Sequence, residues 1–168
     1  KKVIDYLKKK REKIDFCIVG EPTNPNKLGE MIKIGRRGSI SGTIMISGSQ
    51  GHVAYPHLSN NPINTLVKIC KKLNEQKLDK GNKNFQPSNL EFTSINVDNK
   101  ATNVIPATAR AQFNVRFNNH HTSNSLKKKI NSIVKSLSKK NKCKFKIDFH
   151  VSGESFLTKP NKTIYMAK

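Results

Sequence analysis

Four short segments in which every second residue is apolar, with two helical segments between them, constrain this chain more than any other feature. Side chains at alternate positions share one face of a β-strand, whereas a spacing of three or four is typical of one face of an α-helix. The order along the chain is strand, helix, strand, strand, helix, strand. That order predicts a four-stranded antiparallel sheet with two helices on one face. The six segments are 38–48, 61–76, 90–97, 107–117, 123–138 and 144–151.

The two flanks have a different pattern. Residues 15–20 form a nearly continuous apolar run, which is typical of a buried parallel strand, and 27–35 is a second strand candidate. We therefore predict an α/β (α+β) chain in which a ferredoxin-like β-α-β-β-α-β domain at 37–152 is inserted into a doubly wound α/β domain. Segments 1–36 and 153–168 would be parts of that second domain. The chain starts without Met and stops within a helical pattern, so we expect it to be an internal piece of a longer protein.

A formal net charge of +21 raises the hypothesis of a nucleic-acid partner, because Lys and Arg neutralise phosphates. The excess is mostly Lys spread along the chain, and runs such as 127–129 are typical of a solvated helix surface. An RNA-binding module is the alternative, because the RNA-recognition fold has the same element order and 113–117 alternates Phe, Val and Phe. That strand lacks the R-G-F-G-F-V-type signature, so we interpret its apolar residues as core and expect no nucleic-acid partner.

The cysteines are Cys17, Cys70 and Cys143, an odd number without a C-x-x-C pair. Neither a disulfide framework nor a structural zinc site is predicted. The sequence also has no apolar run of membrane-spanning length, so no membrane partner is expected. A reducing compartment, the cytoplasm, is the predicted location.

Polar residues that could carry chemistry lie at strand ends and in turns. Glu21 follows the run 15–20, and a carboxylate at a strand end is a good zinc ligand, with a turn-capping role as the alternative. His52 lies in a turn with glycines nearby and could donate to an oxyanion, or could be an ordinary surface residue. Arg36 and Arg116 flank predicted strands, where guanidinium groups can bind carboxylates. A structural role for these arginines is equally open.

Five stretches taken together resemble the succinyl-diaminopimelate desuccinylases, a family of M20-type two-zinc amidohydrolases. Related amidohydrolases and peptidases share the GEPT and GH elements, whereas GRRGS and HVAYPHL favour a desuccinylase over an acetylornithine deacetylase. The stretches occur in order over nearly the whole chain: VGEPT at 19–23, GRRGS at 35–39, QGHVAYPHL at 50–58, NVIP at 103–106 and QFNVRF at 112–117.

The resemblance implies an enzyme that hydrolyses the small molecule N-succinyl-LL-2,6-diaminopimelate to succinate and LL-2,6-diaminopimelate, in lysine and diaminopimelate biosynthesis. It implies two zinc ions per subunit, with Co²⁺ able to substitute, and a homodimer formed through the domain at 37–152. The remaining zinc ligands and the general base are expected outside this stretch, so the chain alone is expected to be inactive. The alternatives are another deacylase or peptidase of the superfamily and a purely structural dimerisation module.

The resemblance also assigns roles to single residues. Glu21 matches a zinc ligand, and His52 matches a histidine that one subunit donates to the oxyanion in its partner's active site. Tyr55 and Asn103 match substrate contacts made in the same way across the dimer. One position departs from the family pattern: Thr102 stands where a second Asn is usual, which weakens the Asn103 assignment. The residues matched to the binding of substrate carboxylates are Arg36, Arg37, Arg116 and Ser152.

Overall fold

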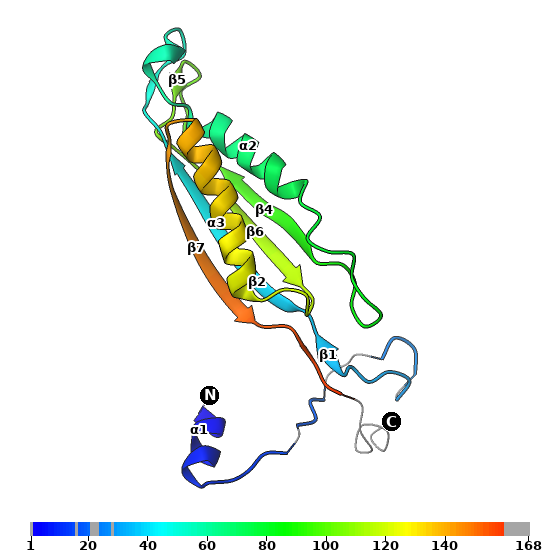
Figure 1. The fold of residues 1–168 in the computed structure, drawn as a ribbon. Helices are drawn as coiled ribbons and strands as arrows, with labels where there is room; N and C mark the ends of the chain where they lie inside the picture. The colour runs from blue at the N-terminus through cyan, green and yellow to red at the C-terminus, as the bar shows by residue number, and fades with distance from the viewer. Residues whose placement is uncertain (1, 16, 21–23, 28, 160–168) are drawn as a thin grey trace. The chain divides into compact units, whose positions relative to one another are not determined.

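The computed structural model describes residues 2–15, 17–20, 24–27 and 29–159 (Figure 1). The chain divides into two compact units, one of residues 1–33 and 160–168 and the other of residues 34–159. In the first unit, the described residues form one helix, α1 (Lys2–Lys9), followed by irregular backbone.

The strand predicted at 15–20 is absent from the described residues of that segment, which are irregular and exposed. Ile18 and Val19 are each 71% exposed. A parallel strand needs neighbouring strands to pair its N–H and C=O groups, and the described part of the chain offers this run none. The segment therefore keeps an apolar sequence without forming a strand.

The strand predicted at 27–35 is also absent from the described residues of that segment, except for Gly35. Local turn chemistry replaces it: Asn24 Oδ1 accepts from the backbone N–H of Met31 at 2.9 Å, and Gly29 has a φ of 81°. Asn side chains that bond nearby backbone, and Gly at positive φ, favour turns over extended strands. Regular pairing begins only at Gly35.

The second unit contains the predicted four-stranded antiparallel sheet. Each strand of the sheet pairs antiparallel with its neighbours. All six predicted elements begin and end within two residues of their expected positions. The strand order across the sheet is β4 (Asn89–Asn96), β6 (Thr108–Phe117), β2 (Gly38–Ser47) and β7 (Lys144–Gly153).

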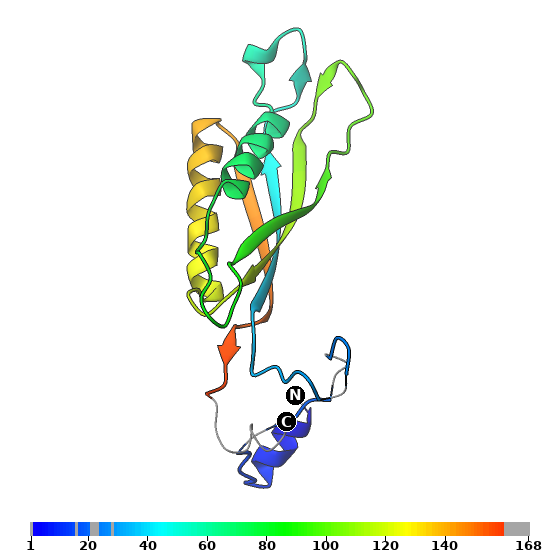
Figure 2. The ribbon, with the colours of Figure 1, turned by 90° about the vertical axis from the view of Figure 1, so that its right-hand side faces the viewer.

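Two helices, α2 (Pro62–Asn74) and α3 (Ser123–Lys140), cover one face of this sheet (Figure 2). Asn61 starts α2, because its side chain accepts from the backbone N–H of Ile63 at 2.9 Å and Pro62 needs no donor at the first helical position. Thr122 starts α3 in a reciprocal capping box with Ser125.

The core lies between the helices and the sheet. Phe113 and Phe117, the aromatic residues of the central strand β6, are 1% and 0% exposed, so they face the helices rather than solvent. This arrangement removes the support for an RNA-binding strand, which would need its aromatic rings on an open face. The helices contribute apolar residues at helical spacing, namely Leu66, Ile69, Leu73, Leu126, Ile130 and Val134.

Two short ribbons that the sequence did not predict extend the sheet at opposite ends. At the end that we call the base, β1 (Gly35–Arg36) pairs with β8 (Phe156–Leu157). At the other end, which we call the tip, β3 (Gly51–His52) pairs with β5 (Val104–Ile105) and is followed by a 3-10 turn at Pro56–Leu58 (Figure 1). These ribbons place the candidate site residues.

Candidate functional site

The tip brings together three of the predicted site residues. His52 lies on β3, directly opposite Val104 of β5, and the carbonyl of Asn103 accepts from the backbone N–H of Val53 at 3.1 Å. The ring centroids of His52 and Tyr55 are 5.9 Å apart. His52, Tyr55 and Asn103 are therefore neighbours, although about 50 residues separate the two segments in sequence.

The tautomer of the neutral His52 imidazole follows from its local contact. Its Nδ1 accepts a hydrogen bond of 3.1 Å from the backbone N–H of Ala54. A ring nitrogen that accepts carries no proton, so the neutral imidazole holds its proton on Nε2. Because His52 is exposed, Nε2–H is a donor that a molecule outside this chain can reach.

The base brings together a second group of predicted residues. Arg116 of β6 lies opposite Ser39 of β2, and Ser39 lies opposite Gly153 of β7. The guanidinium of Arg36 lies against Gly153, where any side chain would collide with it. Arg36, Arg116 and the start of β8 thus border the same end of the sheet.

Ser152 lies at the same end of the sheet, at an irregularity in the strand pairing. The register between β2 and β7 shifts between Ser39 and Ile40, which pair with Gly153 and Val151, so Ser152 is the extra residue of a β-bulge. Bulges re-aim side chains and are common beside functional sites. The Ser152 side chain is exposed and lies at the same end of the sheet as Arg36 and Arg116.

Arg37 is placed differently from Arg36. Its Nη1 donates to the carbonyl of Pro87 and to Oδ1 of Asn89, both at 3.2 Å. These bonds tie the residue between β1 and β2 to the start of β4 and the segment just before it. The sequence resemblance assigns both Arg36 and Arg37 to substrate binding. In the structure, the Arg37 guanidinium bonds to residues of its own domain.

The tip and the base are too far apart to form one site within a single chain. They lie at opposite ends of β2, a ten-residue strand, and a strand of that length spans about 30 Å. Figure 2 shows the two ribbons at the two ends of the sheet. A small molecule that contacted both groups would therefore need the tip from one copy of the domain and the base from another.

The described residues do not form a metal site. Glu21, the predicted zinc ligand, lies outside them. Among the residues that are described, no three His, Cys, Asp or Glu side chains are grouped so that they could hold a metal ion. The donor set of this part of the chain therefore does not fit zinc by itself.

One polar cluster at the base was not foreseen. Asp79 lies 3.2 Å from His121, measured from Oδ2 to Nε2, and accepts from Nδ2 of the buried Asn118 at 2.7 Å. Burial raises the pKa of the Asp79 carboxyl, but hydrogen bonds from Ser88, Gly81 and Asn118 outweigh it and lower the pKa to about 2. The D-K-G-N sequence at 79–82 is a turn signal that could have indicated an organised loop.

No helix among the described residues is long and apolar enough to cross a membrane.

Comparisons with known proteins find succinyl-diaminopimelate desuccinylases as relatives by sequence. It is 66% identical over 166 residues to a succinyl-diaminopimelate desuccinylase of Pelagibacter ubique, covering 99% of this chain and 43% of the relative. A succinyl-diaminopimelate desuccinylase of Parvibaculum lavamentivorans is 48% identical over 160 residues, covering 95% of this chain and 40% of the relative. The chain thus spans about two fifths of the length of these curated relatives.

Solved structures share the fold at low sequence identity. A tripeptidase from Staphylococcus aureus superposes with a TM-score of 0.67 at 14% identity, covering 80% of this chain and 34% of that chain. An aminopeptidase from Bacillus cereus superposes with a TM-score of 0.64 at 11% identity, covering 79% and 34%. Residues 34–154, which include the sheet, both helices and the tip, match the M20 peptidase dimerisation domain, and the chain belongs to that family.

Proposed function

We propose that the protein containing this chain is a zinc-dependent succinyl-diaminopimelate desuccinylase that works as a homodimer. The observation that carries the proposal is the separation of the tip from the base. Two sets of substrate-binding residues at opposite ends of one domain suit an enzyme in which each active site combines the base of one subunit with the tip of its partner. Identity of 66% to a protein of that name supports the choice of substrate.

In this proposal, the base holds the carboxylates of the substrate. Arg36 and Arg116 are permanently charged, and a guanidinium binds a carboxylate through two parallel hydrogen bonds. The exposed Ser152 hydroxyl, on the β-bulge at the same end of the sheet, adds a neutral donor in this proposal. The domain around this site carries many Lys residues, so an anionic succinyl group also meets a favourable long-range field.

The tip supplies a donor at the amide that is cleaved. Nε2–H of His52 points away from its own backbone contact and donates to the oxygen that becomes negative in the tetrahedral intermediate. Tyr55 and Asn103 border His52 and contact the substrate from the same side. A donor fixed before the reaction stabilises the developing charge without reorganisation, which is why it lowers the barrier.

Two zinc ions would supply polarisation of the carbonyl and an activated water when bound. Glu21 is the residue of this chain that we assign to one of them. The other ligands and the general base are expected in parts of the protein outside the described residues.

The dimer would form along the β4 edge and the neighbouring surface of α2. Val67 on α2 and Ile95 on β4 are each 57% exposed, so both are large apolar side chains that a second copy could cover. An edge strand also has unpaired backbone groups that a second copy can pair. The tip precedes α2 directly, so this surface would bring each tip towards the partner subunit.

We also place the enzyme in the cytoplasm. All three cysteines are among the described residues, and all are free. Free thiols in a protein are typical of a reducing compartment.

The test is an assay of the purified full-length enzyme loaded with zinc, on succinyl-diaminopimelate and on acetylornithine at equal concentrations. A clear preference for the succinylated substrate is expected, because the base presents two guanidinium groups for its carboxylates. Equal or greater activity on acetylornithine would assign the protein to another branch of the superfamily. Hydrolysis of neither substrate would reject the proposed activity.

A further inference from the structure

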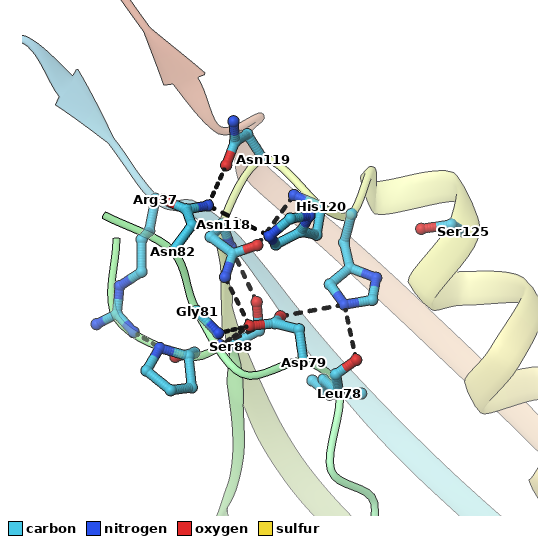
Figure 3. Close-up of polar contacts among 12 residues, drawn as sticks. Arg37, Leu78, Asp79, Gly81, Asn82, Ser88, Asn118, Asn119, His120 and Ser125 are labelled. Atoms are coloured by element: carbon cyan, nitrogen blue, oxygen red, sulfur yellow. Dashed lines mark hydrogen bonds and ion pairs between the residues drawn. The ribbon is translucent and has the colours of Figure 1, made fainter. Parts of the chain in front are cut away.

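The segment 78–88, which we call the brace, is held by the carboxylate of Asp79. Oδ1 of Asp79 accepts from the backbone N–H of Gly81 at 2.7 Å and of Ser88 at 3.2 Å. One carboxylate therefore bonds both ends of the segment. Between them, Gly81 turns the chain with a φ of 74°. Figure 3 shows Asp79 at the centre of these contacts.

The loop that joins β6 to α3 also bonds the Asp79 carboxylate. Asn118 is fully buried; its Nδ2 donates to Asp79 at 2.7 Å, and its backbone N–H donates to Ser88 Oγ at 2.9 Å. His121 pairs with Asp79 and also lies 3.2 Å from the carbonyl of Leu78. The loop that joins β6 to α3 and the brace thus form one hydrogen-bonded block (Figure 3).

The outer part of the brace is a rigid turn. Oδ1 of Asn82 accepts from the backbone N–H groups of Asn84 and Phe85, at 3.0 and 3.1 Å. Asn82 and Phe85 also pair through their backbones. Nδ2 of Asn82 donates to Asn119 Oδ1 at 2.9 Å, which joins this turn to the loop between β6 and α3. The position of Phe85 is therefore fixed relative to the sheet.

The brace makes two contacts, one with the β1–β8 ribbon and one with the residue that directly follows β1. The Phe85 ring lies so close to Gly35 that a Cβ atom there would be 3.0 Å from the ring. Two residues further on, just after β1, the guanidinium of Arg37 donates to Pro87 and Asn89. These contacts lie on either side of Arg36, the residue of the ribbon that borders the carboxylate-binding group.

The ribbon needs such support. It consists of two residue pairs, Gly35 with Leu157 and Arg36 with Phe156, together with one further bond from Thr158 N–H to the carbonyl of Ile34 at 2.7 Å. A two-stranded ribbon of this length is not stable in water without packing against something else. Phe156 is 54% exposed, so little packing comes from that side.

We propose that the brace is a positioning element that holds the β1–β8 ribbon, and with it the Arg36 guanidinium, in the geometry that binds the substrate's carboxylate. Phe85, which meets Gly35, and Pro87, which accepts from Arg37, are its contact residues, and Asp79 is the residue that organises it. This inference rests on the proposed function for the role of Arg36, but not for the mechanical role of the brace.

The mechanical role is tested by hydrogen exchange in the full-length enzyme without substrate. In Phe85→Ala, exchange in the peptide containing Thr158 should be at least about tenfold faster than in the unmodified protein, because the ribbon opens more often. Phe145→Ala is the matched control, since Phe145 is a partly buried aromatic residue on β7 near the tip. Unchanged exchange at Thr158 in Phe85→Ala, or equal acceleration in both variants, would overturn the brace.

The catalytic consequence is tested by steady-state kinetics on succinyl-diaminopimelate. Phe85→Ala should raise KM about tenfold and change kcat by less than about twofold, because the brace affects ground-state binding through Arg36 and does not touch the reacting amide. Phe85→Leu, which keeps an apolar contact with Gly35, should restore most of the loss. An unchanged KM together with faster exchange would overturn the link to Arg36. Absence of any desuccinylase activity would reject the proposed function and leave the exchange result standing.

Discussion

The backbone N–H of Ala54 donates to Nδ1 of His52 at 3.1 Å, which fixes the proton of the neutral imidazole on Nε2. This contact within one tight turn decides which way the histidine can act. A donor is presented to the outside, rather than an acceptor, so His52 suits the stabilisation of an oxyanion and not the abstraction of a proton.

His52→Ala in the full-length enzyme should therefore lower kcat by roughly 10² to 10³, the usual cost of losing one oxyanion donor. Bound zinc, measured by atomic emission, should stay the same because His52 is not assigned to the metal. His57→Ala, at the same exposed tip, is the control and should keep kcat within a few-fold. Unchanged turnover in His52→Ala would remove this residue from the mechanism.

Mixed dimers test whether the tip acts across the subunit interface. We expect His52→Ala and Arg116→Ala to be nearly inactive as separate homodimers. After the two are mixed, unfolded and refolded together, half of the dimers should contain one of each subunit. Each of these has one intact site, which combines the base of one subunit with the tip of the other.

The refolded mixture should recover roughly a quarter of the unmodified activity, as expected for a twofold-symmetric dimer with shared sites. The control is a mixture of two His52→Ala preparations, which should stay inactive. If tip and base act within the same subunit, the mixed dimers will show no recovery.

The dimer surface can be tested by placing a charge on α2. Val67→Glu should weaken dimerisation at least about tenfold in sedimentation experiments, because a buried charge without a partner costs several kcal/mol. Lys128→Glu is the control on the exposed surface of α3. A Val67→Glu protein with the same dimer affinity would place the interface elsewhere on the domain.

Asp79 should make the stability of the domain depend on pH at the acid end. Its pKa is lowered from 3.8 to about 2 in the folded state. The folded protein thus holds this proton more weakly than the unfolded chain. The carboxylate then stabilises the fold above pH 4, and this contribution is lost as the pH falls towards 2.

At pH 7, Asp79→Asn should lower the free energy of unfolding by about 1–3 kcal/mol, since several donors lose a charged acceptor. The difference from the unmodified protein, measured by urea titration of the full-length enzyme, should shrink below pH 4. Asp148→Asn, on the exposed face of β7, should change stability by less than about 0.5 kcal/mol. A deficit in Asp79→Asn that stays constant from pH 7 to 2 would contradict the assignment.

Much of the dimerisation domain could be predicted from the sequence, because the spacing of its apolar residues indicates which side chains share one face of a strand or helix. Phe113 and Phe117 on β6, and Leu66 and Leu73 on α2, are core residues that the pattern identified. The short ribbons were missed for the same reason. With two residues in each strand, β1 and β8 have no periodicity that a pattern could reveal.

The sequence by itself determined the sheet, its two helices and the residue types of the candidate site, since alternation and turn chemistry act over a few neighbouring residues. Only the tertiary structure decided that His52 joins Asn103 at one end while Arg36 joins Arg116 at the other. The tertiary structure also decided that Arg36 and Arg37 have different contacts. It likewise decided that Asp79, Asn118 and His121 form one hydrogen-bonded block. These contacts join residues tens of positions apart, and such pairings depend on how completed elements pack rather than on any local preference of the chain.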